Sequence, residues 1–260
     1  MIRLIGILTK KSGMSRVDFI DYYEKRHVPL VRRIFPSFVG YSRNFVLPAG
    51  VIEGGHIEHA PPPPEFDVIT SLWFSDEIGL ESMMRTLNED ETRNAVIADE
   101  EQFLARDRSL TFRVDEHVTP AEALGRATKV NGGPMTKMIC MFARREGMSL
   151  NAFRDYYEET HAVLGASQIS VLAGYARNYV IPESELSVRG FANARRPDFD
   201  GFTELLFRSK ADLDEMLASF MRPDLARIFS EDEERLFDRK KLQRFLVDER
   251  ITSLDRESVA

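Results

Sequence analysis

The chain of 260 residues has a single cysteine, Cys140, so it cannot form an internal disulfide. A lone cysteine is typical of proteins in a reducing compartment, and we therefore expect a cytoplasmic protein. Apolar residues flank Cys140, which favours a small buried side chain over a nucleophile. No apolar run approaches the roughly 20 residues that a membrane-spanning helix needs. The opening MIRLIGILTKK is too short for a secretory signal and instead predicts a strand.

An excess of positive charge is also absent. The chain has 35 Lys and Arg against 42 Asp and Glu, a net charge of -7, with the two signs interspersed. Such a chain would repel a phosphate backbone, so we expect no nucleic-acid partner. Because no apolar run is long enough to span a bilayer, we also expect no membrane partner. The sequence has no nucleophile elbow, phosphate-binding loop or dinucleotide fingerprint. Function must therefore be sought in another feature, an internal repeat.

The segment GMSRVDFIDYYEKRH, which ends at His27, recurs 134 positions later as GMSLNAFRDYYEETH, which ends at His161. At the same offset GYSRNFVLP matches GYARNYVIP, and at an offset of 133 FDVITSLWF matches FDGFTELLF. Chance does not sustain such a register, so the sequence indicates a tandem duplication. We predict a first unit at 1–118, a linker at 119–134 and a second unit at 135–260.

Each unit shows strand and helix signals in the same order. In the first unit IRLIGIL, YSRNFVL, FDVITSLWF and residues 110–118 predict strands. A first helix begins after Ser15, and a second helical region extends from Leu80 to about Arg106 with a break near Asn88 or Glu89. The order β-α-β-β-α-β predicts an α+β fold made of two ferredoxin-like units.

A sheet of this kind has helices on one face only, so its other face stays exposed unless something covers it. We expect the two sheets to pack face to face as an internal pseudo-dimer, an intramolecular dimeric α+β barrel. The sequence leaves open whether two such chains form a further homodimer.

The repeated pattern GMS...F...YYE..H, followed in the first unit by Pro29 and Leu30, resembles the EthD family of the dimeric α+β barrel superfamily. The second unit adds FDGFTELLF to this resemblance, which spans nearly all of both units. It implies enzymes without a cofactor, such as dehydratases, cyclases, monooxygenases and lactone isomerases, that act on aromatic or polyketide-like molecules.

The family histidine falls on His27 and is retained in the second unit as His161, without the following proline. The family pattern Asp-Gly-x-x-Glu is intact only in the second unit, as Asp200, Gly201 and Glu204. The two units have therefore diverged, and we expect their pockets to differ.

His27 and His161 are the first catalytic candidates. Each falls near the predicted C-terminus of a helix, where the helix dipole favours a protonated imidazole that can exchange a proton or hold an anion. Tyr23 and Tyr157 lie one turn earlier on the same helical face and could orient a substrate. The alternative is that the histidines only cap their helices and the tyrosines belong to the core.

Glu204 is the third catalytic candidate, because it lies in the middle of an otherwise apolar strand. Burial between the sheets would raise its pKa and suit a general base. The alternative is a buried ion pair with Arg177.

Further residues are candidates for substrate binding. An arginine on a strand can hold a carboxylate or phenolate, although a solvated or salt-bridged arginine is the alternative. The substrate-binding candidates are Tyr23, Tyr157, Arg43, Asn44, Arg177, Asn178 and Trp73.

The stretch EGGHIEH, residues 53–59, has residue types that bind metals. It has no counterpart in the second unit and lies in a Gly/Pro-rich loop, so we predict no metal site there.

Together these patterns predict an acid–base enzyme without a cofactor, of lyase, dehydratase, isomerase or cyclase type, acting on a small aromatic or hydrophobic substrate. A carrier protein that binds a hydrophobic metabolite without converting it is the main alternative. A haem-dependent relative of the same superfamily is a third.

Overall fold

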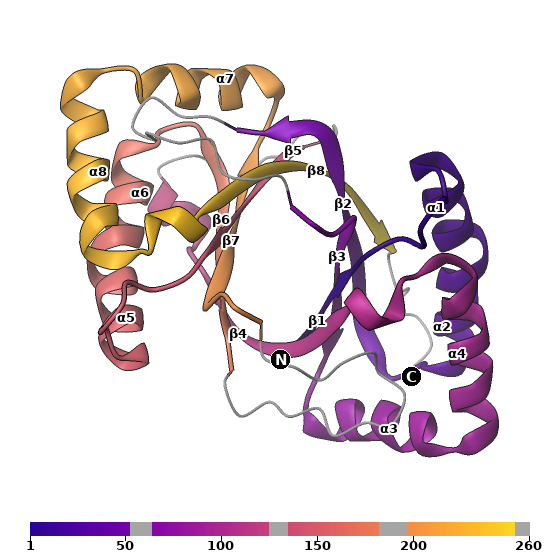
Figure 1. Ribbon diagram of the computed structural model, residues 1–260. Coiled ribbons are helices and arrows are strands. Elements are labelled where there is room, and N and C mark those ends of the chain that lie inside the picture. Colours follow the sequence, from indigo (N-terminus) through magenta and orange to yellow (C-terminus); the bar gives the residue numbers. More distant parts are fainter. Residues whose placement is uncertain (53–63, 125–134, 182–196, 253–260) are drawn as a thin grey trace.

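The computed structural model describes residues 1–52, 64–124, 135–181 and 197–252 and has a closed barrel of eight strands with helices on its outside (Figure 1). The first half supplies four strands, β1 (Ile2–Leu8), β2 (Phe38–Val51), β3 (Val68–Phe74) and β4 (Leu110–Val118). The second half supplies the other four, β5 (Thr136–Phe142), β6 (Leu172–Val180), β7 (Gly201–Phe207) and β8 (Gln243–Thr252). The predicted α+β class and barrel are therefore confirmed.

The helices also repeat between the halves. In the first half they are α1 (Arg16–Tyr22), the π-helical turn η1 (Tyr23–His27), α2 (Val28–Ile34), α3 (Glu77–Asn88) and α4 (Asp90–Phe103). In the second half they are α5 (Leu150–Tyr156), the π-helical turn η4 (Tyr157–His161), α6 (Ala162–Gln168), α7 (Lys210–Ser219) and α8 (Pro223–Leu236). Short 3₁₀ turns are η2 (Arg106–Arg108), η3 (Ala121–Leu124) and η5 (Arg239–Lys241). The predicted break near Asn88 is confirmed by the boundary between α3 and α4.

The strand order around the barrel is β1-β3-β2-β8-β5-β7-β6-β4, and every neighbouring pair is antiparallel. The two halves meet at two seams, β2 with β8 and β4 with β6. The inner faces of the two sheets pack together as expected. The sheets also join edge to edge at these seams, which the expectation of face-to-face packing did not include. Edge pairing satisfies the backbone N–H and C=O groups that each four-stranded sheet alone would leave open.

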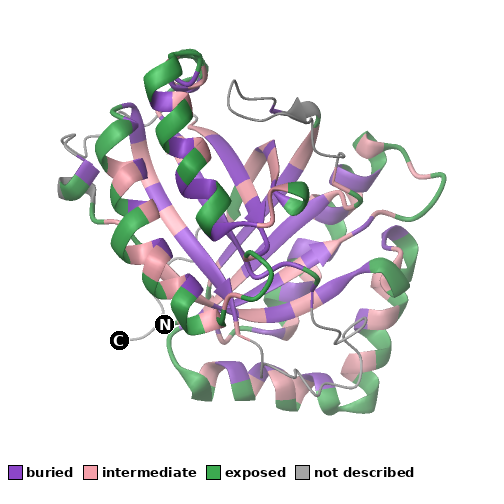
Figure 2. Ribbon diagram, turned by 60° about the vertical axis from the view of Figure 1, so that its left-hand side comes forward, coloured by how far each residue is buried: buried purple, intermediate pink, exposed green. Residues whose placement is uncertain are grey.

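Buried apolar side chains form three clusters. One fills the barrel and combines strands of both halves, for example Ile5, Phe112, Ile139 and Phe245. The other two lie outside the barrel, each between the strands and the helices of one half, and the C-terminal one also includes Ile52 and Leu124. Figure 2 shows this division, with buried residues along the strands and exposed residues on the outer faces of the helices. No helix in the described ranges is both long and apolar enough to span a membrane.

The first helix of each half does not end at its histidine. A π-helical turn closes at His27, with Val28 N–H bonded to the carbonyl of Tyr23, and the chain continues directly into α2. Pro29 lies in the first turn of α2, where a missing N–H is tolerated. The second half has the same turn at His161 without a proline. The expectation of a histidine at a helix C-terminus is therefore wrong, and the dipole argument built on it does not apply.

The glycine of the family pattern permits close packing at the start of β7. A Cβ atom on Gly201 would lie 2.5 Å from the carbonyl oxygen of Asn178 and 2.8 Å from the ring of Phe142. We expect Gly201→Ala to lower the free energy of unfolding by about 1–3 kcal/mol, as overpacked cores do. Urea unfolding checks this, with Gly6→Ala as the control, since its Cβ would approach nothing closer than 3.4 Å. Equal effects of both substitutions would contradict the steric account.

Candidate functional site

Each half contains a cavity between its helices and the outer surface of its strands. The N-terminal cavity has an empty volume of about 720 Å³ and includes Tyr23 and His27 in its wall. The C-terminal cavity has about 730 Å³ and includes Tyr157 and His161. Both volumes include the space at the mouth of each cavity that is open to solvent. Apolar side chains form most of both walls, so the few polar groups there decide the chemistry.

The histidine of each cavity is bound to a largely buried aspartate from the last α-helix of its half. His27 Nδ1 lies 2.7 Å from Asp99 Oδ2, and His161 Nδ1 lies 2.5 Å from Asp232 Oδ2. A carboxylate can only accept a hydrogen bond, so Nδ1 carries the proton in both rings. The opposite nitrogen, Nε2, is then free of a proton in the neutral ring and can act as a base.

Two tyrosines precede each histidine, the first at the end of α1 or α5 and the second at the start of the π-helical turn. Tyr22 and Tyr156 donate from their hydroxyls to the other oxygen of Asp99 and Asp232, at 3.1 and 3.0 Å. These bonds fix the position of each carboxylate, and the carboxylate in turn fixes the orientation of its histidine. π-Helical turns are frequent at functional sites, and here the turn brings tyrosine and histidine together on one wall.

The second tyrosine of each pair packs edge-to-face against the histidine. The ring centroids of Tyr23 and His27 are 5.0 Å apart, and those of Tyr157 and His161 are 4.7 Å apart. Burial, partly offset by hydrogen bonds with Thr70 and Tyr41, raises the pKa of Tyr23 to about 12. Burial also raises the pKa of Tyr157 well above 10.0. Both phenols therefore stay protonated at neutral pH and can only donate or accept hydrogen bonds.

A glutamate follows each aspartate and lies in the cavity wall. Glu100 pairs with Arg106 at 2.8 Å, and Glu233 pairs with Arg244 at 2.6 Å. Burial raises the pKa of the Glu100 carboxyl above its usual 4.5, against the lowering effects of His27 and Arg106. A carboxyl group with a raised pKa beside an imidazole is a common arrangement in acid–base sites.

The sequence analysis missed these acidic residues, although a signal was present. Asp99 and Glu100 correspond to Asp232 and Glu233 at the repeat offset of 133, within the matching stretches ADEEQF and EDEERL. Acidic pairs that recur inside an otherwise amphipathic helix, on the side that also carries apolar residues, would have indicated a role beyond solvation.

Glu204 lies inside the barrel, away from the described walls of both cavities. Its carboxylate contacts Lys137 Nζ at 2.6 Å and Arg3 Nη1 at 2.8 Å. Burial alone would raise the pKa of Glu204, but Arg3 and Lys137 outweigh it and lower the pKa well below the usual 4.5. The expected rise in pKa is therefore wrong, and so is the alternative pairing with Arg177.

Two of the substrate-binding candidates contact Arg3, the partner of Glu204 inside the barrel. Asn178 accepts a hydrogen bond from Arg3 Nη1 at 2.7 Å. Trp73 stacks beneath the Arg3 guanidinium at 4.5 Å and donates from its indole nitrogen to Glu116 at 3.2 Å. Both side chains therefore stabilise a buried cation. Asn44, fully buried on β2, donates to the backbone carbonyl of Ile69 at 3.3 Å.

The two arginine candidates form equivalent ion pairs. Arg43 contacts both oxygens of Glu24, at 2.9 and 2.7 Å, and Arg177 contacts both oxygens of Glu158, at 3.1 and 2.6 Å. Glu24 and Glu158 belong to the π-helical turns, so each pair ties a turn to the neighbouring strand. Neither arginine is in the described wall of a cavity, and the salt-bridged alternative describes both.

The aspartate of the family pattern has a structural role in both halves. Asp200 accepts from the backbone N–H of Arg144 at 2.8 Å and pairs with the guanidinium of that residue. Asp67, its counterpart in the first half, accepts from the backbone N–H of Lys10 at 2.8 Å. This carboxylate therefore orders the segment after the first strand of each half.

The stretch 53–59, which was considered for metal binding, lies outside the described residues. Within the ranges that the structure does describe, no group of three or more His, Cys, Asp or Glu side chains converges to hold a metal ion.

The fold and the two cavities define an α+β barrel protein in which a histidine–aspartate pair opens onto an apolar pocket in each half. The EthD domain matches this chain twice, at residues 11–107 and 145–240. The chain therefore belongs to the EthD family and carries two copies of the domain in tandem. The resemblance inferred from the repeated motif is confirmed.

Solved structures that are similar to this chain have little sequence in common with it. A proposed monooxygenase from Fusobacterium nucleatum subsp. nucleatum is 6% identical with a TM-score of 0.51, covering 97% of this chain and 94% of its own. A dye-decolorizing peroxidase from Bacteroides thetaiotaomicron is 9% identical with a TM-score of 0.49, covering 94% and 92%. A chlorite dismutase from Candidatus Nitrospira defluvii is 6% identical with a TM-score of 0.46, covering 95% and 90%. A search of curated proteins found no match.

Proposed function

We propose that this chain is an acid–base enzyme, built from two ferredoxin-like units, that acts on small aromatic or polyketide-like molecules. The reaction is of lyase, dehydratase, isomerase or cyclase type and needs no cofactor, and its place is in cytoplasmic catabolism or secondary metabolism. One observation carries the proposal: in each half a histidine held by a largely buried aspartate faces an apolar cavity. Such a pair supplies a base and its conjugate acid where water is largely excluded.

The chemistry follows from the charges around the ring. Nε2 of His27 or His161 takes a proton from a substrate carbon or oxygen, and the adjacent carboxylate stabilises the imidazolium that forms. The imidazolium then returns the proton to another atom of the substrate or to a leaving group. Glu100 and Glu233 lie in the same walls and are placed to exchange a second proton.

Tyr23 and Tyr157 act in this scheme as hydrogen-bond donors. Because burial keeps both phenols protonated, neither can serve as a base near neutrality. Each can donate to a substrate carbonyl next to the carbon that loses a proton, and a donor in that position stabilises an enolate.

The test is a comparison of product formation from candidate aromatic catabolites by the wild type, His27→Ala, His161→Ala and the double variant. We expect the double variant to lose turnover and the single variants to show which half works. Unchanged product formation in the double variant would remove the acid–base proposal. Binding without turnover in the wild type would favour the carrier.

The geometry also permits a haem-dependent relative, because histidines that bind haem iron commonly donate their second nitrogen to a carboxylate. An absorbance spectrum after haem addition distinguishes the two. We expect no Soret shift, and a stoichiometric shift that His27→Ala or His161→Ala abolishes would favour haem over the proposed chemistry.

A further inference from the structure

The two cavities are copies of each other at their polar end. At the repeat offsets, five polar wall residues of the N-terminal cavity have identical counterparts in the C-terminal cavity. These polar pairs are Tyr23 and Tyr157, His27 and His161, Tyr41 and Tyr175, Thr70 and Thr203, and Glu100 and Glu233. The same machinery for proton transfer is therefore present twice, and differences elsewhere in the walls must reflect what each cavity binds.

The apolar walls differ in kind. Phe142, Phe220, Phe229 and Phe237 line the C-terminal cavity. The equivalent positions of the N-terminal cavity are Leu8, Leu87, Val96 and Leu104. At these four positions the C-terminal wall is therefore aromatic and the N-terminal wall aliphatic, while Phe35 of the N-terminal wall corresponds to Ile169 of the C-terminal wall. Aromatic side chains favour edge-to-face and offset contacts with a planar ring, in addition to the area they bury. Phe220 and Phe229 already meet in this way, with centroids 4.8 Å apart at 83°.

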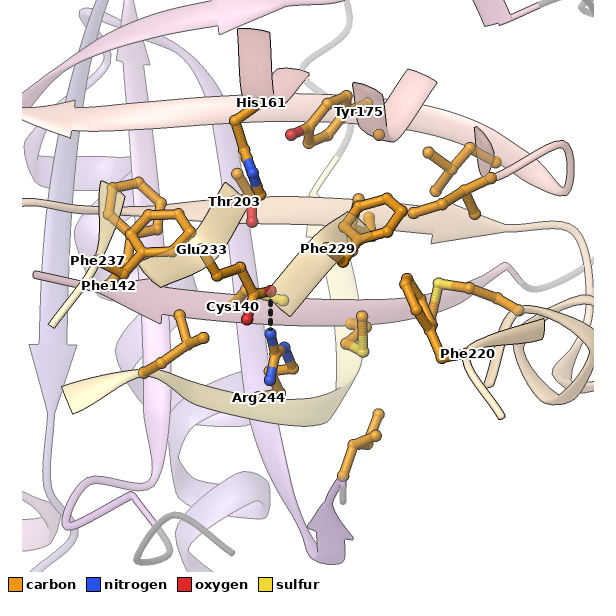
Figure 3. Close-up of a pocket in the computed structure, with 18 of the residues that line it drawn as sticks. Cys140, Phe142, His161, Tyr175, Thr203, Phe220, Phe229, Glu233, Phe237 and Arg244 are labelled. Carbon is orange, nitrogen blue, oxygen red and sulfur yellow. Dashed lines mark hydrogen bonds and ion pairs between the residues drawn. The ribbon is translucent and has the colours of Figure 1, made fainter. Parts of the chain in front are cut away.

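One charged position also differs. Arg244 on β8 lies in the wall of the C-terminal cavity, where its carboxylate partner Glu233 reaches it from α8 (Figure 3). Thr111 on β4 occupies the equivalent place in the N-terminal cavity. The glutamate itself is common to both, but Glu100 is paired with Arg106 of η2, which is outside the described wall. Only the C-terminal cavity, within the described residues, therefore carries a guanidinium in its wall.

We propose that the two cavities bind different molecules and that Arg244 sets the specificity of the second. The C-terminal cavity takes a planar aromatic molecule with an anionic oxygen substituent, and the N-terminal cavity takes a neutral aliphatic or alicyclic molecule. This inference rests on the proposed function only in taking each cavity as a substrate site.

The physical argument concerns hydrogen-bonding capacity and burial. A guanidinium has five N–H donors in a planar fork, so Arg244 can hold Glu233 and a ligand oxygen at the same time. In a mostly apolar wall such a charge-assisted bond is stronger than one made in water. His161 enters the cavity from the opposite side in Figure 3, so a ring anchored at Arg244 spans the space toward the imidazole. The anchor thereby presents the substrate to the base.

Binding of three probes of one shape tests the proposal: 2-naphthoate, 2-naphthol and the neutral 2-naphthamide. Isothermal titration calorimetry gives Kd and stoichiometry for each without requiring turnover. We expect one molecule of 2-naphthoate per chain. In Arg244→Thr, which installs the residue of the other cavity, its Kd should rise about 10- to 100-fold while that of 2-naphthamide changes little. A preference of the wild type for 2-naphthol at pH 10 over 2-naphthoate would identify a phenolate as the anion.

Two further variants keep the result interpretable. Glu233→Gln with Arg244→Gln replaces the ion pair by a neutral hydrogen-bonded pair, and it should lose the preference for the carboxylate as Arg244→Thr does. Thr111→Val alters the N-terminal cavity and should leave the Kd of 2-naphthoate unchanged. Equal losses for the acid and the amide, or a crystal structure with 2-naphthoate in the N-terminal cavity, would overturn the proposal. Because only binding is measured, a failure of the proposed catalysis leaves this inference intact. A failure of this inference likewise leaves the proposed catalysis intact.

Discussion

Replacing Asp99 and Asp232 together by asparagine is expected to lower turnover about 10²- to 10⁴-fold, the usual contribution of one general acid or base. Each carboxylate now holds a proton on Nδ1 of its histidine. An asparagine amide can donate to Nδ1 instead, which moves the ring proton to Nε2 and removes the basic nitrogen from the cavity. Steady-state kinetics across pH checks this, and the loss should appear in kcat more than in KM.

The matched control uses the outer hydrogen bond of the same carboxylates. Tyr22→Phe with Tyr156→Phe removes only the hydroxyl that donates to each aspartate, so the tautomer of each histidine is kept. We expect a decrease of less than about tenfold, as for loss of one neutral hydrogen bond. Turnover that is insensitive to the asparagine substitutions would show that the histidine–aspartate pairs are only structural.

Glu204→Gln is expected to lower the free energy of unfolding by about 3–5 kcal/mol, the usual cost of breaking a buried ion pair from one side. Glu204 is the anion shared by Arg3 and Lys137, each of which has one further carboxylate partner, Glu116 and Glu249. Without the Glu204 carboxylate, the buried positive charges of Arg3 and Lys137 are only partly neutralised. Urea unfolding at neutral pH measures the loss, which should greatly exceed that of Asp21→Asn in an exposed pair with Lys25.

The pH dependence of this effect has a fixed direction. The pKa of Glu204 is lower in the folded chain than its usual 4.5, so its contribution to stability is complete above that pH. As the pH falls below 4.5 the unfolded chain binds the proton first, and the contribution is lost. The difference between wild type and Glu204→Gln should therefore shrink steadily in acid. A difference that stays constant down to pH 3 would contradict the assignment of charge.

Much of the fold could be predicted because the same pattern of strand and helix signals occurs in both halves of the sequence. The repeat located the strands, and residues 110–118 coincide with β4. Helix breaks such as the one near Asn88 leave local signals in capping and propensity. The π-helical turns do not, because Tyr23–His27 and Tyr157–His161 have ordinary helical composition and Pro29 suggests an end that does not occur.

Only part of each site could be predicted from the sequence, because each histidine and its aspartate come from distant segments. His27 could be found from its motif, but Asp99 reaches it from 72 residues further along the chain. The prediction that the arginines line a cavity was wrong for a related reason. A strand position alone could not tell whether Arg43 faces a cavity or binds Glu24 of the neighbouring turn. Strand register and helix placement decide which carboxylate reaches His27 and which group Arg43 binds, and both are set by tertiary packing.

The seams β2–β8 and β4–β6 have a consequence for how this protein could evolve. A barrel assembled from two identical chains must change both of its pockets with every mutation, since symmetry copies each substitution. Joining the halves in one polypeptide makes ring closure intramolecular and independent of protein concentration. It also allows the two halves to diverge independently, so that Thr111 and Arg244 can occupy equivalent positions and give one molecule two distinct specificities.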